Sequence, residues 1–296
     1  MRVIIFGTGA MACLFAARLS KEANVILMGT WAEAITTIQQ RGILLEGPQK
    51  SQVVPVHVDY LGTPLPAADL VIVLVKAWQT EQVAKHLPAY LTPGGLAISF
   101  QNGLGNVECL GTRAFPGSTA EGATLLGPGR VREGGSGPTH AVAPVWVVEL
   151  LRRSGFESYR CTQSESESLL WGKLTISCGI NALTALLRIS NGELLKRPSA
   201  MNLMVRATQE CAAVAGARCV LLPFRDPVVR VKEVAERTAA NKSSMLQDVL
   251  RGAPTECDAI NGAVVGEGMR LGIATPVNDV LWRLMRAAVQ NRSDVR

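Results

Sequence analysis

The first half of the chain alternates between short apolar runs and stretches with helical spacing. Arg2–Phe6 and Asn24–Met28 are two of the apolar runs, and Leu70–Val75 and Leu96–Phe100 are two more. A continuous apolar run of this length is typical of a parallel strand that is covered on both faces. Because such runs alternate with helical stretches, we predict an α/β fold with a doubly wound parallel sheet of the Rossmann type.

The second half of the chain has a different pattern, because strand-like runs stop near Ser164. Apolar residues recur there at helical spacing in these stretches: Leu169–Leu187, Met201–Ala215, Pro227–Ala239, Glu256–Leu271 and Asn278–Val289. We therefore expect two domains, a Rossmann domain over residues 1–162 and an all-helical domain over residues 163–296.

Composition and apolar run lengths narrow the class of protein. Of the 296 residues, 48% are apolar and 18% are charged, which allows a large core and excludes global disorder. The longest apolar stretch, Leu169–Leu187, is interrupted by Lys173, Ser177 and Asn181, so we expect no membrane partner. The apolar N-terminus runs straight into a glycine turn without a cleavage site. We therefore interpret it as a strand and expect a cytoplasmic protein.

The cysteines, the histidines and the net charge narrow the class of protein further. Seven cysteines without CxxC spacing and three separated histidines, His57, His86 and His140, match no metal template, so we expect no metal. The cysteines fit buried reduced thiols better than a disulfide framework. The 30 Lys and Arg residues exceed the 24 Asp and Glu residues, but no basic block with interleaved aromatics suggests a nucleic acid partner. Basic residues near an anionic cofactor and an anionic substrate explain the excess.

A glycine-rich turn follows the first predicted strand and opens a predicted helix. It is a GxGxxA sequence made of Gly7, Thr8, Gly9, Ala10, Met11 and Ala12. Gly7 permits the tight turn, Gly9 lets the main chain approach a pyrophosphate, and Ala12 allows close packing of helix on strand. Small residues could also make a simple strand-to-helix turn. The position at the head of a βαβ pattern favours dinucleotide binding, with the phosphates at the helix N-terminus.

The end of the second predicted strand is where a dinucleotide-binding domain distinguishes NADH from NADPH. The chain has Met28, Gly29, Thr30 and Trp31 there, with neither an acidic residue for the ribose hydroxyls nor an arginine for a 2′-phosphate. These residues alone leave the choice of cofactor open.

A polar stripe marks the apolar segment Leu169–Leu187. Lys173, Ser177, Asn181 and Thr184 are spaced at i, i+4, i+8 and i+11, which places them on one face of a helix. A helix that is apolar nearly all round is normally buried, so the stripe would line a cavity. The alternative is a solvated face, but such a face usually carries several charges and this one carries only Lys173.

This lysine has the chemistry that a carbonyl reductase needs. When hydride reaches a carbonyl carbon, the oxygen gains negative charge, which a nearby ammonium stabilises before it supplies the proton. Asn181 can donate to and accept from a hydroxyl or carbonyl group of a substrate. We therefore interpret the stripe as a substrate-binding face with Lys173 as the proton donor.

With these residues in place, the chain resembles the ketopantoate reductase family over nearly its full length. Besides the GxGxxA turn, the matching motifs occur in the family's order: Val75–Gln79, Gln101–Gly103, Gly122–Gly129, Trp171–Leu174, Ile180–Leu186, Asn191–Leu194, Ser243–Asp248, Thr255–Gly262 and Gly272–Pro276. The resemblance implies an N-terminal Rossmann domain and an all-helical C-terminal domain similar to that of 6-phosphogluconate dehydrogenase, with the active site in the cleft between them.

The resemblance also implies an activity and a cofactor. The family reduces 2-dehydropantoate, a small 2-oxo acid, to (R)-pantoate on the route to pantothenate and coenzyme A. It uses NADPH, which favours NADP over NAD for this chain. Many two-domain reductases of this kind form dimers, so a homodimer is a candidate assembly.

Individual residues take roles from the resemblance. Lys173 matches the catalytic proton donor, and Glu256 matches the carboxylate near this lysine and the cofactor. The substrate-binding positions are Asn102, Ser177, Asn181, Asn191 and Ser244. The cofactor-binding positions are the turn Gly7–Ala12, Lys76, Asn102, Ala123 and Glu256.

Several of these residues also have purely structural interpretations. Ser243 or Ser244 could cap the helix that follows, and Glu256 could complement a helix dipole. Asn102 could belong only to a turn. We favour a catalytic neighbourhood for Glu256, because a buried Lys173 needs a countercharge.

Two departures from the family pattern leave alternatives open. Ser177 stands where the family commonly has an asparagine, and Thr30 and Trp31 stand where it often has a basic residue. The first departure leaves room for reduction of a different small branched or hydroxylated 2-oxo acid, and the second puts the preference for NADPH in doubt. A further alternative is a dinucleotide-binding sensor without turnover, which requires the cofactor site but not Lys173.

Overall fold

The computed structural model describes residues 1–289, and the chain divides into two compact units. The first unit comprises Met1–Gln101 and Asn106–Ser166, and the second comprises Asn102–Gly105 and the chain from Glu167 onward. The short segment 102–105 therefore packs with the helical part of the chain, although it lies in the first half of the sequence. The domain boundary that we expect at residue 162 stays a prediction.

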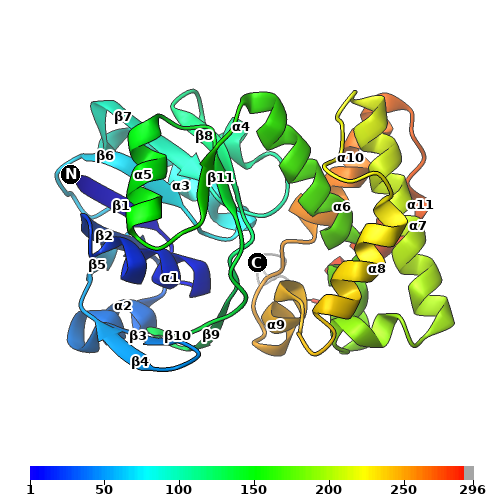
Figure 1. Ribbon diagram of the computed structural model, residues 1–296, viewed down its shortest axis with the longest axis horizontal. Helices are drawn as coiled ribbons and strands as arrows, with labels where there is room; N and C mark the ends of the chain where they lie inside the picture. Colours follow the sequence, from blue (N-terminus) through cyan, green and yellow to red (C-terminus); the bar gives the residue numbers. More distant parts are fainter. Residues whose placement is uncertain (290–296) are drawn as a thin grey trace. The chain divides into compact units, whose positions relative to one another are not determined.

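A mostly parallel sheet forms the centre of the first unit (Figure 1). Its strands, in spatial order, are β12 (Ser158–Arg160), β11 (Thr139–Ala141), β8 (Ala114–Thr119), β7 (Leu91–Ser99), β6 (Ala68–Val73), β1 (Arg2–Phe6), β2 (Asn24–Gly29) and β5 (His57–Tyr60). Neighbours in this sheet are parallel except β8 and β11. The chain goes from β1 to β2 and β5 on one side and then returns to β6, β7 and β8 on the other. This is the doubly wound order that the sequence predicts.

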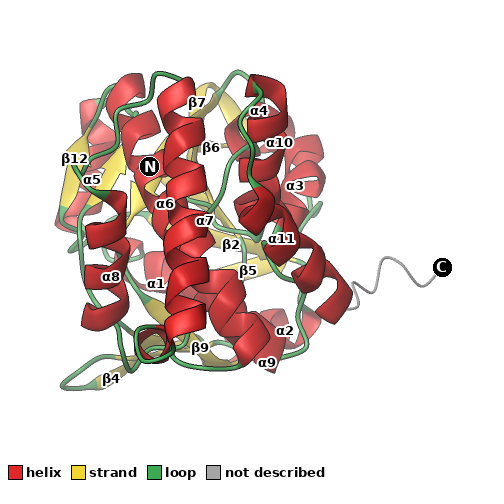
Figure 2. Ribbon diagram, turned by 90° about the vertical axis from the view of Figure 1, so that its right-hand side faces the viewer, coloured by secondary structure: helices red, strands yellow, loops and turns green. Residues whose placement is uncertain are grey.

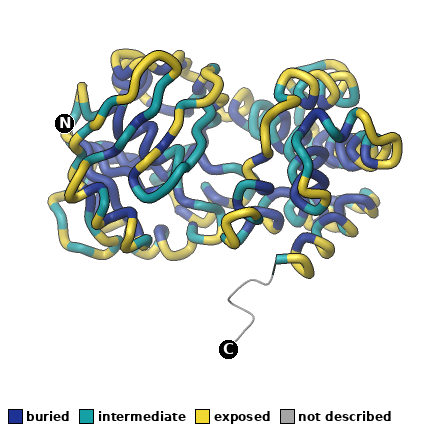
Figure 3. The backbone as a smooth tube through the Cα atoms, turned by 90° about the horizontal axis from the view of Figure 1, so that it is seen from below, coloured by how far each residue is buried: buried dark blue, intermediate teal, exposed yellow. Residues whose placement is uncertain are grey.

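The central strands are buried on both faces, because alternate residues of a strand point to opposite sides of the sheet. In β1, Val3 and Ile5 pack in one apolar cluster together with helix α1 (Ala10–Leu19), whereas Ile4 and Phe6 pack in another. None of these four side chains is exposed, and buried residues such as these are dark blue in Figure 3. The continuous apolar run in the sequence therefore reflects burial on two sides.

Helices and short 3-10 turns connect the strands of the first unit. Their bounds are α2 (Ala32–Arg41), η1 (Ala77–Gln79), α3 (Thr80–His86), η2 (Leu87–Tyr90), α4 (Asn106–Leu110) and α5 (Val145–Arg153). A smaller sheet has the order β4 (Ser51–Val54), β3 (Ile43–Glu46), β10 (Arg130–Glu133) and β9 (Ala123–Gly127). The sequence does not predict this smaller sheet, because its strands are short and glycines surround β9 and β10.

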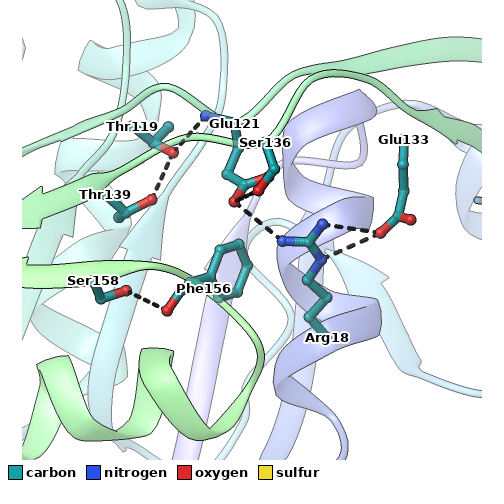
Figure 4. A network of polar contacts seen from close by, with 8 residues as sticks. All are labelled: Arg18, Thr119, Glu121, Glu133, Ser136, Thr139, Phe156 and Ser158. Carbon is teal, nitrogen blue, oxygen red and sulfur yellow. Dashed lines mark hydrogen bonds and ion pairs between the residues drawn. The ribbon is translucent and has the colours of Figure 1, made fainter.

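An ion-pair network ties the segment around β9 and β10 to helix α1 (Figure 4). The guanidinium nitrogens of Arg18 lie 3.3 Å from Glu121 Oε1 and 3.0 Å from Glu133 Oε1. The hydroxyl of Ser136 donates to Glu121 Oε1 at 3.0 Å, and the guanidinium lies 4.9 Å from the ring centre of Phe156. Because the Glu121 side chain is only 1% exposed, Arg18 serves as its countercharge in a nearly dry environment.

The second half of the described chain is helical, as Figure 2 shows in red. Its elements are α6 (Gln163–Leu187), η3 (Asn191–Leu194), α7 (Pro198–Ala217), α8 (Pro227–Arg237), α9 (Ser244–Leu250), η4 (Asp258–Gly262), α10 (Ala263–Leu271) and α11 (Pro276–Ala288). The predicted combination of a Rossmann domain and a helical domain is confirmed. The stretch expected as one helix, Glu256–Leu271, is helical from Asp258 onward, but its first part is a π turn, η4, that continues directly into α10.

Helix α6 starts earlier than the apolar pattern predicts. Glu165 Oε2 accepts the N–H of Thr162 at 2.7 Å, and Thr162 Oγ1 accepts the N–H of Glu165 at 3.2 Å, which makes a capping box in a polar segment. By length and composition alone, α6 could cross a membrane. However, 61% of its most apolar window is buried inside the protein, which is the environment of a core helix.

The cysteines only partly match the expectation of buried thiols. They are free; Cys13, Cys161, Cys178, Cys211 and Cys257 are buried, whereas Cys109 and Cys219 are exposed. For the two exposed thiols the expectation of burial is wrong. Burial raises the pKa of Cys13 to about 12, so this thiol stays protonated and unreactive behind the glycine-rich turn.

Candidate active site

The glycine-rich turn joins β1 to α1 at the carboxyl edge of the sheet. Gly7 has a φ of +127°, and a Cβ there would lie 3.0 Å from the carbonyl oxygen of Leu74. Glycine is therefore required at this position. The N–H of Gly7 donates to Met28 O at 2.7 Å, which ties the turn to the end of β2. Ala12 is fully buried and would lie 3.2 Å from the same Cβ, so α1 packs closely on the strand.

Gly9 leaves the N-terminus of α1 open. It is the N-cap residue, and as a glycine it offers no side-chain acceptor to the first N–H groups of this helix. A Cβ at Gly9 would meet no atom of the described residues within 4 Å. The first turn, which contains Ala10 and Met11, carries no acidic side chain that would repel an anion. Open N–H groups and the helix dipole favour a phosphate, so the turn fits the pyrophosphate of a dinucleotide.

Other candidate cofactor residues also belong to the first unit. Thr8 is buried within the turn, and the hydroxyl of the exposed Thr30 accepts from Gln79 Nε2 at 3.3 Å. Lys76 follows β6 and is half-buried, and Ala123, the first residue of β9, is half-buried as well. Lys76 and Ala123 are therefore partly accessible to a ligand. Their contacts with a cofactor stay predictions.

Lys173, Glu256 and Asn102 come together in the second unit. Lys173 lies on α6 and is half-buried, whereas Glu256 precedes η4 and is 5% exposed. The side-chain amide of Asn102 donates to Glu256 Oε2 at 3.3 Å. The negative charge of Glu256 also acts on the ammonium of Lys173. An amine, a carboxylate and an amide from three separate segments thus form one polar cluster.

Two opposing effects set the pKa of Lys173. Burial lowers the pKa, because protein atoms replace the water that would stabilise the ammonium, and the charge of Glu256 raises it by a smaller amount. The net result is a pKa below the ordinary value for lysine. An amine whose pKa is moved toward neutrality gives up a proton more readily, which suits a general acid.

The loop that carries Asn102 is fixed by the π turn η4. The N–H of Leu104 donates to the carbonyl oxygen of Ala259 at 3.1 Å. Gly103 has a φ of +82°, and a Cβ there would overlap the same carbonyl group. Glycine at position 103 therefore allows the turn to approach the main chain of Ala259 closely. This turn places the Asn102 amide within hydrogen-bonding distance of Glu256.

The polar stripe of α6 divides into two parts. Ser177 and Asn181 are half-buried, like Lys173, and stay accessible to a ligand. Thr184 is fully buried, and its hydroxyl donates to Ser243 Oγ at 2.7 Å. The last member of the stripe therefore has a structural role.

The two remaining candidate residues lie on other elements. Ser243, whose Oγ accepts the N–H of Leu246 at 3.1 Å, caps α9, and this leaves Ser244 exposed. Asn191 is 7% exposed and donates through Nδ2 to Thr238 Oγ1 at 2.9 Å, so it joins η3 to α8. Substrate contacts of Ser244 and Asn191 stay predictions.

Sequence reasoning missed the role of Gln101, the first residue of the motif Gln101–Gly103. Gln101 is buried, and its Nε2 donates to Val75 O at 3.1 Å and to Thr80 Oγ1 at 2.8 Å. It thereby anchors the chain next to Asn102. A glutamine at the end of an apolar strand was the available signal, because such a residue needs partners when buried.

Within residues 1–289, no group of three His, Cys, Asp or Glu side chains is arranged to hold a metal ion. A cavity in the first unit lies beside Cys161 and Arg160, and none of the candidate residues lines it.

Comparison with known proteins identifies the family of the chain. The family model described as ketopantoate reductase PanE/ApbA matches residues 3–143, and the model of its C terminal matches residues 166–290. The 2-dehydropantoate 2-reductase of Halobacterium salinarum is 32% identical over an alignment that covers 97% of this chain and 99% of that protein. The chain belongs to the ketopantoate reductase family.

Solved structures agree with this membership. The PanE/ApbA family ketopantoate reductase from Ralstonia eutropha JMP134 superposes with a TM-score of 0.89 at 29% identity, over 97% of this chain and 98% of that chain. D-mandelate dehydrogenase in its ternary structure with NADH and anilino(oxo)acetate has a TM-score of 0.91 at 24% identity, with the same coverage. The second comparison shows a shared fold. The family resemblance read from the sequence motifs is confirmed.

Proposed function

We propose that this protein reduces 2-dehydropantoate to (R)-pantoate, with a nicotinamide dinucleotide as the hydride source and Lys173 as the proton donor. The observation that carries the proposal is the cluster of Lys173, Glu256 and Asn102 in a member of the ketopantoate reductase family. As a member of this family, the enzyme would act in the cytoplasm on the route to pantothenate and coenzyme A.

The residues of the second unit act on the carbonyl group of the oxo acid. The Lys173 ammonium donates a hydrogen bond to the carbonyl oxygen and transfers its proton as negative charge develops there. Glu256 stabilises the ammonium before the transfer, and Asn102 orients the carboxylate of Glu256 through its hydrogen bond. When bound, the reduced nicotinamide supplies the hydride.

Binding of the substrate uses the remaining polar side chains. Ser177 and Asn181 share the accessible face of α6 with Lys173, so they would orient the groups next to the reacting carbonyl. Ser244 and Asn191 would hold the carboxylate and hydroxyl groups of the acid, as their family positions imply.

The cofactor binds to the glycine-rich turn of the first unit. Gly7 and Gly9 shape the turn, and the open N-terminus of α1 receives the pyrophosphate. The family favours NADPH, and Lys76 at the carboxyl end of β6 is a candidate partner for its 2′-phosphate. Thr30 offers no charge at the end of β2 that would bind a 2′-phosphate, so NADH is a second candidate cofactor.

Absorbance at 340 nm tests the proposal directly. Purified protein is mixed with 2-dehydropantoate and either NADPH or NADH, and consumption of the reduced cofactor is followed. We expect turnover with at least one cofactor and a faster rate with NADPH. Tight cofactor binding without oxidation would instead favour a sensor role.

Ser177 favours a second candidate function, reduction of another small branched or hydroxylated 2-oxo acid. A serine at this accessible position on α6 is shorter than the asparagine common in the family, so the pocket has a different reach. A panel of 2-oxo acids ranked by kcat/KM separates the two candidates. Faster turnover of another acid than of 2-dehydropantoate would establish the second candidate.

A homodimer stays a prediction, which sedimentation of the purified protein tests.

A further inference from the structure

Asn261 is a fully buried side chain to which the proposed reaction gives no role. It lies on the π turn η4, and its Nδ2 donates to the carbonyl oxygen of Cys178 on α6 at 3.1 Å. The same Nδ2 donates to Asn278 Oδ1 on α11 at 2.9 Å. Asn261 therefore joins η4 to the main chain of the helix that carries Lys173.

The orientation of the Asn261 amide is set by a second amide behind it. Asn278, also fully buried, donates through Nδ2 to Ala207 O at 3.0 Å and to Glu210 Oε2 at 2.9 Å. Because both hydrogens of this amide are used, its Oδ1 is the atom left to accept from Asn261. Glu210 in turn accepts the N–H groups of Val277 and Asn278 at 2.9 Å each, which caps α11. The chain of bonds thus runs from α7 through α11 to η4 and ends on α6.

The π turn holds both polar partners of the site. The N–H of Gly262 donates to Cys257 O at 2.9 Å, five residues back, and Glu256 directly precedes Cys257. The carbonyl of Ala259, inside η4, holds the loop of Asn102 through Leu104. π turns are rare in proteins, and those that occur are frequently found at functional sites. A displacement of η4 would therefore move Glu256 and Asn102 together.

We propose that Asn261 is a positioning residue, which sets the separation between the Glu256 carboxylate and the Lys173 ammonium by tying η4 to α6. The proposal rests on the proposed function, in which Lys173 supplies the proton. The two hydrogen bonds of Asn261 go to Cys178 O and Asn278 Oδ1, so its proposed effect passes through the position of Glu256.

The charged groups around Lys173 give this proposal a measurable signature. Glu256 is the charge that acts on the ammonium from the segment before η4. Asp258 on η4 instead accepts a hydrogen bond from Trp282 Nε1 at 2.6 Å, and Glu167 on α6 pairs with Arg218 at 3.2 Å. The segment 102–105 carries no charge. Retreat of Glu256 would therefore lower the pKa of Lys173 further, whereas entry of water into a loosened site would raise it.

The test measures the pKa of Lys173 in the full-length protein without using catalysis. Competitive acetylation at a series of pH values, read by mass spectrometry of the Lys173 peptide, reports the pKa of this amine. Asn261→Leu removes both donated bonds at similar volume. Thr175→Val is the matched control. Thr175 lies on α6 and, like Asn261, is fully buried, but within residues 1–289 its hydroxyl donates only to Trp171 O on the same helix and to Cys211 Sγ on α7.

In Asn261→Leu we expect the pKa of Lys173 to fall by roughly 0.5 unit, and the alkaline limb of the kcat/KM profile to move to lower pH by the same amount. Thr175→Val should leave the pKa unchanged. In a Glu256→Gln background, Asn261→Leu should have no further effect on Lys173, because the group through which it acts is gone. If Asn261→Leu does not fold, Glu210→Gln, which weakens the same chain of bonds at a partly exposed position, should shift the pKa in the same direction.

An unchanged or raised pKa of Lys173 in the folded variant would overturn the proposal. An equal fall in Thr175→Val would overturn it too, because it would show general loosening of α6. The proposed function is tested by a different experiment. A wild-type protein that reduces no 2-oxo acid would refute the proposed function, whereas the acetylation result would still show whether Asn261 affects the pKa of Lys173.

Discussion

The side-chain amide of Asn102 donates to Glu256 Oε2 at 3.3 Å, although 154 positions separate the two residues in the sequence. Asn102 follows a strand of the Rossmann sheet, and Glu256 precedes a helical segment near the other end of the chain. The bond brings a residue from the first half of the sequence to the carboxylate that acts on Lys173. Both residues therefore belong to the unit in which the substrate is expected to bind.

Removal of the Lys173 ammonium should abolish most of the activity. We expect Lys173→Ala to lower kcat by roughly 10²–10⁴-fold, which is the usual contribution of general acid catalysis, while cofactor affinity changes little. Steady-state kinetics and fluorescence titration with NADPH measure the two effects. Lys196→Ala is the control, because Lys196 is exposed and pairs only locally with Glu193. Near-normal turnover by Lys173→Ala would rule out its role as proton donor.

The pH dependence of the reductase should follow the proton on Lys173. Reduction needs the ammonium, so activity is present below the pKa of Lys173 and is lost as pH rises through it. Because Glu256 raises this pKa, Glu256→Gln should move the alkaline limb of kcat/KM to lower pH by about one unit. A limb that stays in place, or moves to higher pH, would show that Glu256 does not act on the lysine. Glu193→Gln, on the surface, serves as the comparison.

The two glycines of the phosphate turn should respond differently to substitution. Gly9→Ser places a hydroxyl in open space, where it can cap the N–H groups of α1. We expect unchanged or slightly higher stability and dinucleotide binding weaker by roughly tenfold or more, because the phosphate loses those donors. Gly7→Ala should instead lower the free energy of unfolding by more than about 1 kcal/mol, since its φ of +127° is strained for any side chain.

Urea denaturation and calorimetric titration with NADPH separate these two effects. Undiminished cofactor affinity in Gly9→Ser would place the pyrophosphate elsewhere. Undiminished stability in Gly7→Ala would contradict the strain argument.

The countercharge of Glu121 should matter for stability more than for chemistry. Arg18→Met leaves the Glu121 carboxylate buried without its partner, and we expect the free energy of unfolding to fall by about 3 kcal/mol. The double variant Arg18→Met with Glu121→Gln should recover part of this loss, because the buried Glu121 charge is then gone and only the more exposed Glu133 has lost its partner. Arg153→Met is the control, since Arg153 is 58% exposed and its pair with Glu22 is worth at most ~1 kcal/mol. Equal losses for Arg18→Met and Arg153→Met would refute the burial argument.

Local patterns in the sequence determined the main features of this protein. Apolar runs such as Leu70–Val75 predict parallel strands, because a strand buried on both faces must be apolar at every position. The spacing of Gly7, Gly9 and Ala12 predicts the phosphate turn, and the stripe of Lys173 and Asn181 predicts an accessible face on an apolar helix. Each of these features depends on residues that are near one another in the chain, so one sequence is sufficient to find them.

Tertiary structure alone decided which distant residues meet. The sequence does not show that segment 102–105 packs with the helical unit. Nor does it show that Thr184 donates a hydrogen bond to Ser243 or that Asn261 donates one to the main chain of α6. Such contacts depend on the packing of helices against one another, and amides, hydroxyls and carboxylates accept many partners with similar energy. The partner of a buried polar side chain is therefore set by geometry that the folded chain creates, which no spacing along the sequence records.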